Sequence, residues 1–164
     1  VTGVVLFART SKALARMNKL FQTHTITKTY WAIVKQQPEE LEGRLAHYLI
    51  RNEKQNKSYA YETPKPGAKH AVLSYKVVAK SDNYTLLEIQ LETGRHHQIR
   101  AQLAKIGSPI KGDLKYGFAR SNPDGGISLH AHSLEFEHPV SGEKIKIVAP
   151  VPSEKLWQEI TQGL

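Results

Sequence analysis

Two strand-like segments joined by a short turn restrict the fold of this chain more than any other feature of its sequence. In residues 84–92 apolar side chains recur at every second position, which is the pattern of a half-buried strand. A similar segment, residues 71–80, precedes it, and only Ser81, Asp82 and Asn83 separate the two. Strands joined by so short a turn run antiparallel. We therefore predict a β-hairpin as part of an antiparallel sheet.

Further strands and three helices are predicted around this hairpin. Strand candidates are residues 4–9, 28–35, 127–137 and 144–148, of which the first is a short apolar run typical of a buried strand. Thr10 and Ser11 can cap a helix that carries apolar residues at helical spacing up to Phe21. A second helix is expected at about 96–106, with Gly107 as its stop, and a third after Ser153 as its cap.

Two segments are predicted to lack this regularity. Residues 51–69 are polar, basic and interrupted by proline and glycine, which indicates an exposed loop or a ragged hairpin, and residues 107–126 read as a long loop. The sum is an α+β fold with a mixed, mainly antiparallel β-sheet and flanking helices. We expect residues 1–164 to form a single domain.

Charge and composition narrow the class of partner. The formal net charge is +8, and all of the excess lies in residues 1–82. This excess favours a polyanionic partner such as RNA or DNA, or an anionic membrane surface, and charge alone leaves plain solubility as an alternative explanation. Cysteine is absent, which excludes a disulfide scaffold and a thiolate metal site. No secretion signal and no apolar stretch long enough to span a bilayer is present, so we expect a cytoplasmic protein without a membrane partner.

The densest group of reactive side chains is the segment Gly94-Arg95-His96-His97-Gln98-Ile99-Arg100. It falls where a strand is predicted to pass into a helix, and the free N–H groups of a helix start favour an anion. Arg100 lies beside the apolar stripe of that helix, so we expect it to be half-buried and to need a carboxylate or phosphate partner. An ordinary salt bridge would satisfy the same requirement.

Other residues allow competing interpretations. His130 and His132 lie on one face of a predicted strand, which is usable metal-ligand geometry, but no HExxH motif or third ligand accompanies them. Asp113 follows a glycine in a predicted loop, where a turn hydrogen bond is the more common role of aspartate than acid catalysis. Tyrosines near basic residues can stack on unpaired bases or can simply fill the core.

Several segments together resemble one family, the RluA-like pseudouridine synthases. The main match is residues 91–117, LETGRHHQIRAQLAKIGSPIKGDLKYG, with support from residues 2–10, TGVVLFART, and residues 28–34, KTYWAIV. Leu129-His130-Ala131 and His138-Pro139 also fit, so the resemblance covers the whole chain in order. Position 96 is His here and is commonly Thr in the family.

The resemblance implies a function and roles for individual residues. The family isomerises uridine to pseudouridine in ribosomal or transfer RNA, with no metal and no organic cofactor. Tyr30 matches the tyrosine that packs against the target uracil, and Arg100 matches the arginine that pairs with the catalytic aspartate. Leu129 matches an apolar residue lining the pocket. Arg95 and His97 belong to the same signature and are expected to face RNA or to support the structure.

The chain departs from the family at the catalytic aspartate. In the family this residue belongs to a His-Arg-Leu-Asp segment just before the strand that residues 2–10 match, whereas here no aspartate precedes Asp82. The sequence also begins with Val1 rather than Met. We therefore expect a fragment of a complete enzyme, inactive by itself and monomeric. The alternatives are a non-catalytic RNA-binding module of the same fold and, with less support, a histidine-metal hydrolase.

Overall fold

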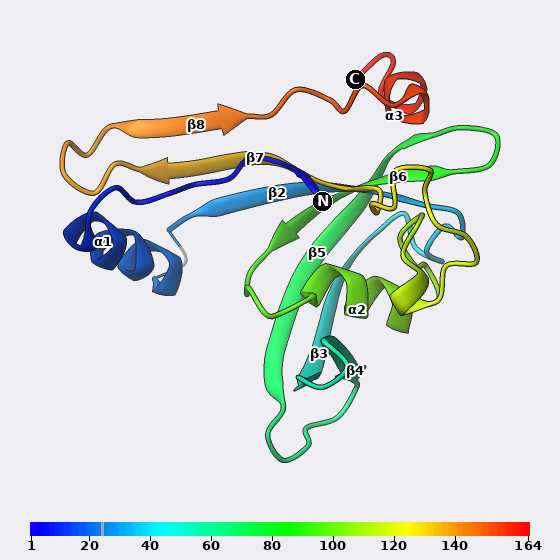
Figure 1. Ribbon diagram of the computed structural model, residues 1–164, viewed down its shortest axis with the longest axis horizontal. Coiled ribbons are helices and arrows are strands. Elements are labelled where there is room, and N and C mark those ends of the chain that lie inside the picture. The colour runs from blue at the N-terminus through cyan, green and yellow to red at the C-terminus, as the bar shows by residue number, and fades with distance from the viewer. Residues whose placement is uncertain (24) are drawn as a thin grey trace.

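The computed structural model describes residues 1–23 and 25–164. Figure 1 shows one long, strongly twisted sheet with helices at its ends and on its faces. In chain order the elements are β1 (Thr2–Gly3), α1 (Ser11–Gln22), β2 (Thr27–Val34), β3 (Glu42–Asn52), β4 (Lys57–Tyr61), β5 (Lys69–Lys80), β6 (Thr85–Leu91), α2 (Gln98–Lys105), the 3-10 helix η1 (Leu114–Tyr116), β7 (Leu129–Glu137), β8 (Lys144–Val148) and α3 (Lys155–Ile160).

The strands form a single eight-stranded sheet in the order β1-β7-β2-β6-β5-β3-β4, with β8 also paired to β7. Every pairing is antiparallel except the short parallel contact of β1 with β7. The predicted α+β class with a mainly antiparallel sheet is therefore confirmed, as is the hairpin of β5 and β6. None of the helices in the described ranges is long and apolar enough to cross a membrane.

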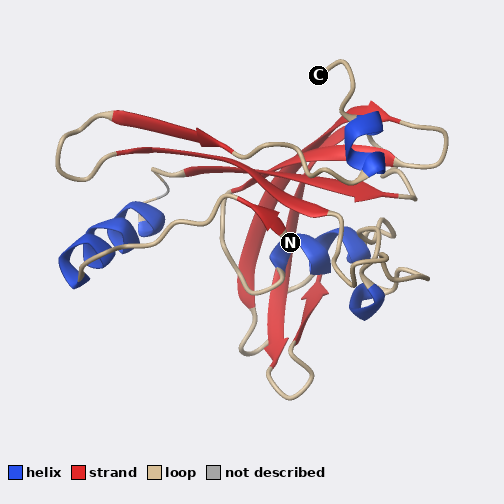
Figure 2. Cartoon of the chain, turned by 45° about the horizontal axis from the view of Figure 1, so that its top comes forward, coloured by secondary structure: helices blue, strands red, loops and turns tan. Residues whose placement is uncertain are grey.

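The two faces of β2 explain why the sheet is covered on both sides. Ala32 and Val34 point into the main core, which α2 closes with Ile99 and Leu103. Trp31 and Ile33 point the other way and pack against Trp157 and Ile160 of α3. Figure 2 shows these two helices on opposite sides of the strands. Each buried aliphatic side chain contributes about 1.5–3 kcal/mol of transfer free energy, so both helices are held chiefly by the hydrophobic effect.

Two of the predicted helix boundaries are confirmed. The N–H of Ala13 donates to the Oγ1 of Thr10 at 3.1 Å, so Thr10 caps α1 as expected. Gly107 follows the end of α2 with a φ of 80°, a conformation that glycine adopts at little cost. The cap predicted at Ser153 is wrong, because α3 is preceded by Glu154 and no side chain caps it.

The predicted buried strand over residues 4–9 is also wrong. Only Thr2–Gly3 are a strand, and the side chains of Val5 and Phe7 are 70% and 83% exposed. The reason lies in β7, whose outer edge pairs with β1 at His130 and Ala131 and with β8 from Ser133 onward. Because β8 already occupies that edge, the chain has no strand to pair with beyond Gly3 and leaves the sheet.

The middle of the chain is more ordered than the sequence suggests. No strand is predicted in residues 36–50, yet β3 begins at Glu42 and pairs with both β4 and β5. The basic segment of residues 51–69 contributes β4, so it is a hairpin rather than a loop. Cross-strand partners supply these strands with backbone hydrogen bonds that local sequence preference does not reveal.

Gly3 offers a direct test of the β1–β7 contact. Its φ is 111°, and a Cβ there would overlap the backbone of Ala131. Gly67 has a φ of 78° with open space around it, so Gly67→Ala is a matched control that adds strain without a clash. We expect Gly3→Ala to lower the free energy of unfolding by about 1–3 kcal/mol more than Gly67→Ala does, as measured by urea denaturation. Equal losses would contradict the pairing.

Candidate active site

The strand-to-helix turn between β6 and α2 is built by side chains of its own sequence. Gln98, the first residue of α2, is buried, and its Oε1 accepts from the Thr93 hydroxyl at 2.8 Å and the Arg95 N–H at 2.9 Å. Its amide nitrogen donates to the carbonyl of Val72 on β5. His97 precedes the helix with a φ of 52°, an uncommon conformation for this residue type. These bonds fix the direction in which the turn presents Arg95.

Arg100 forms a bidentate ion pair with Asp113. Its Nε and Nη2 lie 2.7 and 2.8 Å from the two carboxylate oxygens. The Asp113 side chain is 1% exposed and that of Arg100 is 17% exposed. The expectation that Arg100 is half-buried and holds an anion is therefore confirmed, and the anion is a carboxylate of this chain. The same contact shows that Asp113 serves a buried ion pair.

His97 extends this ion pair toward Tyr116. The Nη1 of Arg100 lies 2.9 Å from the Nε2 of His97, and because arginine can only donate, that ring nitrogen must accept. The proton of the neutral ring is then on Nδ1, which lies 3.0 Å from the Tyr116 hydroxyl. Burial, followed by the charge of Arg100, lowers the pKa of His97 to about 4. His97 is thus a neutral structural link near pH 7.

The same network anchors the β3–β4 hairpin. The N–H of Ser58 on β4 donates to the Tyr116 hydroxyl at 2.8 Å, and the Ser58 hydroxyl lies 2.8 Å from Nδ1 of His96. His96 also contacts Asn56 at the tip of the hairpin, at 3.1 Å. Ser58 and Asn56 could not be predicted from the sequence, because their neighbours in the chain give no sign of a contact with His96, about 40 positions later.

Tyr30 and Arg95 line one cleft, of about 440 Å³, between β2, β7 and the β6–α2 turn. Its other walls come from the segment after β1, from Phe21 and Lys28, and from β7 at Ala131 and Ser133. Burial raises the pKa of the Tyr30 hydroxyl, which is therefore a neutral donor at physiological pH. The cleft combines an aromatic ring, a hydroxyl and two cations.

Three of the predicted site residues lie outside this lining. Arg100 and His97 belong to the ion-pair network described above, and Leu129 is 6% exposed and lies in the main core beside Ala32 and Ile99. Tyr30 packs against that same core. Leu129 and Tyr30 thus belong to the same region of the core.

The two strand histidines serve packing contacts. The ring of His132 stacks on Trp31 with centroids 3.6 Å apart, and His130 is buried, with its Nδ1 2.8 Å from the Thr2 hydroxyl. Within the described residues no group of three histidine, cysteine or acidic side chains could hold a metal ion.

A comparison of the sequence with protein families gives a direct match. The family described as RNA pseudouridylate synthase matches residues 1–105. The chain belongs to this family. The resemblance seen in the sequence motifs to the RluA-like synthases is thereby confirmed.

Named relatives agree with this assignment to the family. It is 36% identical over 168 residues to an uncharacterized RNA pseudouridine synthase of Synechocystis, covering 99% of this chain and 51% of the relative. It is 33% identical over 176 residues to ribosomal large subunit pseudouridine synthase D of Vibrio cholerae, covering 99% and 52%. The chain thus spans about half the length of these curated relatives.

A solved structure shares the fold of this chain. Human RNA pseudouridylate synthase domain containing 4 superposes with a TM-score of 0.74 at 22% identity, covering 90% of this chain and 66% of that one. At that level of identity the likeness concerns the arrangement of the strands and helices.

The neutral state of His97 has a measurable consequence. The unfolded chain takes up a proton near the ordinary histidine pKa of about 6.5, whereas folded His97 does so only at about 4. The unfolded state therefore binds more protons between these values, and stability falls as the pH is lowered through that window. We expect the His97 ring resonances to titrate with a midpoint near 4 in an NMR pH series. A midpoint at 6 to 7 would contradict the Arg100 contact.

The ion pair predicts an asymmetric double-mutant result. Arg100→Met leaves the buried Asp113 carboxylate without its cation and should cost about 3–5 kcal/mol in urea unfolding. Adding Asp113→Leu removes that orphaned charge, so we expect the double variant to be more stable than Arg100→Met alone. If Asp113→Leu instead lowered the free energy of unfolding as much in the Arg100→Met variant as it does in the wild type, the two side chains would not be acting as a pair.

Proposed function

We propose that this chain forms the uridine-binding part of an RNA pseudouridine synthase, which isomerises uridines in ribosomal or transfer RNA. The observation that carries the proposal is the cleft in which Tyr30 and Arg95 meet, in a chain that belongs to this family. The name of the Vibrio relative, which specifies the large ribosomal subunit, favours ribosomal RNA as the substrate. We expect the protein to act on RNA in the cytoplasm. We also expect it to be a monomer and to use no metal and no organic cofactor.

The chemistry assigns distinct tasks to the residues of the cleft. A uridine must leave its base stack to be reached, and the ring of Tyr30 gives the flipped uracil a surface to replace part of that stacking. The N1–C1′ bond of the uridine then breaks, the base turns, and C5 bonds to C1′. C5 loses its proton to solvent and N1 takes up a proton from solvent, so the product is an isomer of uridine. Arg95 supplies a positive charge close to this centre, where negative charge on the catalytic carboxylate or the base needs stabilisation.

Arg100 takes a supporting role in this proposal. The family resemblance implies that it pairs with the catalytic aspartate, but its Nε and Nη2 bind Asp113 and its Nη1 binds His97. We propose that Arg100 and His97 hold the β6–α2 turn in place, and that Arg95 on that turn faces the reacting groups. Leu129 then acts by supporting Tyr30 through the core.

The catalytic carboxylate is not among the aspartates of this chain. Asp113 is buried against Arg100, Asp82 lies in the β5–β6 turn, and Asp124 accepts the N–H of Gly126 in a loop. None of the three lines the cleft of Tyr30 and Arg95. We propose that the nucleophilic aspartate comes from another part of the complete protein, and that these 164 residues alone do not catalyse the reaction.

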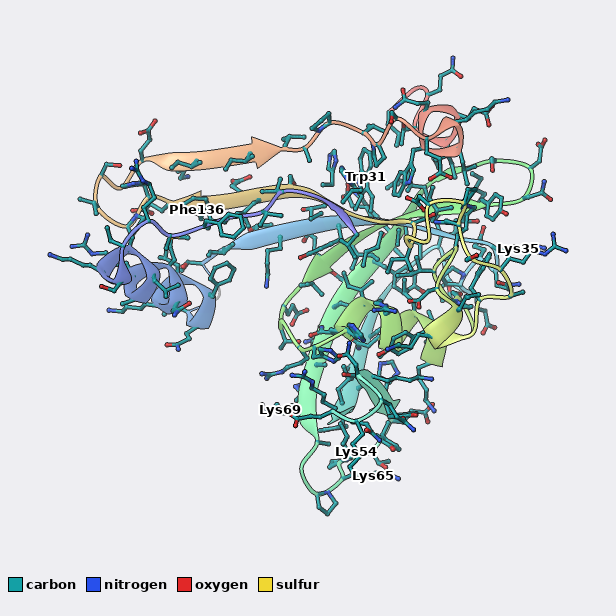
Figure 3. All side chains as sticks on the ribbon, viewed as in Figure 1. Trp31, Lys35, Lys54, Lys65, Lys69 and Phe136 are labelled. Carbon is teal, nitrogen blue, oxygen red and sulfur yellow. The ribbon has the colours of Figure 1, made fainter. Side chains whose placement is uncertain are left out.

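A basic surface formed by β3, β4, β5 and the turns between them can hold the RNA backbone. Figure 3 shows Lys54, Lys65 and Lys69 close together at the far end of β3, β4 and β5. Two tyrosines share this region, with Lys57 5.2 Å from the ring of Tyr59 and Lys65 4.2 Å from the ring of Tyr61. Cations beside exposed aromatic rings suit single-stranded RNA, because phosphates and bases are bound at once. The basic residues of α1 are a second candidate contact.

Tritium release tests the proposal. RNA labelled with tritium at uridine C5 should lose label to water when incubated with the complete gene product and should keep it with the 164-residue chain. In the complete product, Tyr30→Ala and Arg95→Ala should each lower kcat by about a hundredfold, because each removes a group that contacts the reacting nucleotide. Arg120→Ala, which removes an exposed arginine from a distant loop, is the matched control and should leave the rate unchanged.

The absence of a carboxylate from the cleft also favours one alternative, a non-catalytic RNA-binding module of the same fold. In that case the complete product would bind RNA and release no tritium. Release by the 164-residue chain alone would overturn the proposed origin of the aspartate. A rate that Arg95→Ala leaves intact would remove this residue from the reaction.

A further inference from the structure

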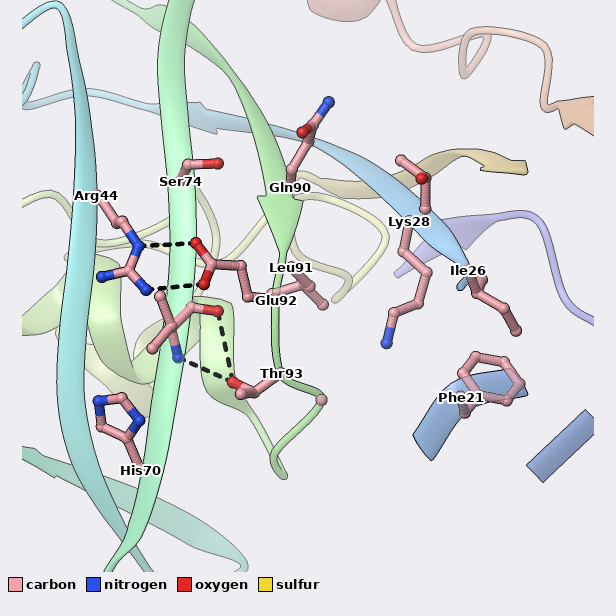
Figure 4. Close-up of a pocket in the computed structure, with 13 residues that line it drawn as sticks. Phe21, Ile26, Lys28, Arg44, His70, Ser74, Gln90, Leu91, Glu92 and Thr93 are labelled. Carbon is pink, nitrogen blue, oxygen red and sulfur yellow. Dashed lines mark hydrogen bonds and ion pairs between the residues drawn. The ribbon is translucent and has the colours of Figure 1, made fainter. Parts of the chain in front are cut away.

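A second cleft, of about 510 Å³, adjoins the one that holds Tyr30. The two share Phe21, Lys28, Leu91 and Gly94 as lining residues. Figure 4 shows the second cleft, with Lys28 and Phe21 on one side and the strands that carry Arg44 and Glu92 on the other. Lys28 therefore lies on the border between the two clefts.

The ammonium group of Lys28 has an unusual environment. The side chain is half-buried, and burial lowers its pKa. Across the described part of the chain it makes no hydrogen bond and no ion pair, and its one specific contact is the face of Phe21, 5.3 Å from Nζ. By contrast, half-buried Lys111 binds both Asn122 and Glu154.

The neighbouring residues keep this ammonium accessible. A Cβ on Gly94 would lie 3.1 Å from the Nζ of Lys28, so the glycine leaves room for the charged group at the border. Glu92 lines the second cleft, but both of its carboxylate oxygens bind Arg44, each at 2.8 Å. The carboxylate is thereby neutralised, and an anion can approach Lys28 without strong repulsion.

The walls of the second cleft indicate what else the ligand carries. Phe21 and Ile26 make one side apolar, and the ring of Phe21 is 39% exposed. The opposite side offers hydrogen-bonding groups from Ser74 and Gln90. A ligand that matches has an anionic group, a flat apolar face and polar edges, and a nucleotide has all three.

We propose that the second cleft binds the nucleotide next to the target uridine, with the phosphate that joins the two nucleosides on Lys28. This inference rests on the proposed function, which places the uridine beside Tyr30. A phosphate between two nucleosides belongs at the border of two adjoining clefts, and Lys28 occupies that border. The base of the second nucleotide then lies between Phe21 and the polar side of the cleft.

Salt dependence of RNA binding isolates the phosphate contact. The complete gene product, as wild type and as Lys28→Met, is titrated with an oligouridylate of twelve nucleotides at several salt concentrations. Loss of one phosphate contact should weaken binding about threefold to tenfold at low salt and reduce the slope of log K against log salt by about 0.7. Lys155→Met, which removes an exposed lysine on α3, should keep the wild-type slope. Lys28→Arg retains the charge, so this variant should keep most of the wild-type salt slope.

Two further probes separate the phosphate from the rest of the cleft. Phe21→Leu should weaken oligouridylate binding and leave the salt slope unchanged, because it removes a stacking surface and no charge. Lys28→Met should weaken competition by the dinucleotide UpU and have no effect on competition by uridine. An unchanged slope for Lys28→Met, or equal effects on UpU and uridine, would overturn the proposal and leave Lys28 as a packing partner of Phe21.

The experiments distinguish failure of this inference from failure of the proposed function. If wild-type protein releases tritium from labelled RNA and Lys28→Met keeps the wild-type salt slope and KM, only the proposed nucleotide site in the second cleft is refuted. If wild-type protein releases no tritium, the proposed reaction fails, and the salt slope still decides whether Lys28 contacts a phosphate. Unfolding curves of each variant show whether a weaker affinity reflects loss of the fold.

Discussion

The ion pair between Arg100 and Asp113 is the contact on which the arrangement of this domain most depends. A carboxylate as deeply buried as that of Asp113 is tolerated only with a well-aligned cation, and Arg100 supplies one through two parallel hydrogen bonds. The pair joins α2 to the loop before η1, and His97 and Tyr116 carry the connection to β4. Elements from three separate parts of the chain are thus fixed to each other, and the turn that presents Arg95 is fixed with them.

Much of the fold was predictable because its signals are local. The alternation in residues 84–92 and the short turn before it determine the β5–β6 hairpin. Thr10 marks the start of α1 because its side chain accepts a hydrogen bond from a residue only three positions later. The failures have a common cause, which is competition for strand partners. Residues 4–9 look like a strand but meet an edge of β7 that β8 already occupies, and β3 is a strand because β4 and β5 flank it.

Members of the candidate site can be proposed from the sequence, but their arrangement in space cannot. The motif at residues 94–100 identified Arg95, His97 and Arg100 as a group, but neighbouring positions on a turn and a helix point in different directions. Only the fold shows that Arg95 faces the cleft of Tyr30 while Arg100 turns toward Asp113. The role of Lys28 was not visible at all, since a lysine two positions before a tyrosine carries no sign that a glycine 66 residues later leaves space for its ammonium.

The two ends of the sheet also bear on how copies of this protein behave in a crowded solution. Strands β4 and β8 each have a single neighbour in the sheet. The Ser58 N–H on β4 is already bound by the Tyr116 hydroxyl, whereas the open edge of β8 could recruit a strand from another molecule. Lys57 lies on β4, and Lys144 and Lys146 lie on β8. Charged lysines on open edges oppose such strand addition by repulsion and by the cost of removing them from water. The excess of positive charge that suits an RNA substrate thereby also protects the sheet against aggregation.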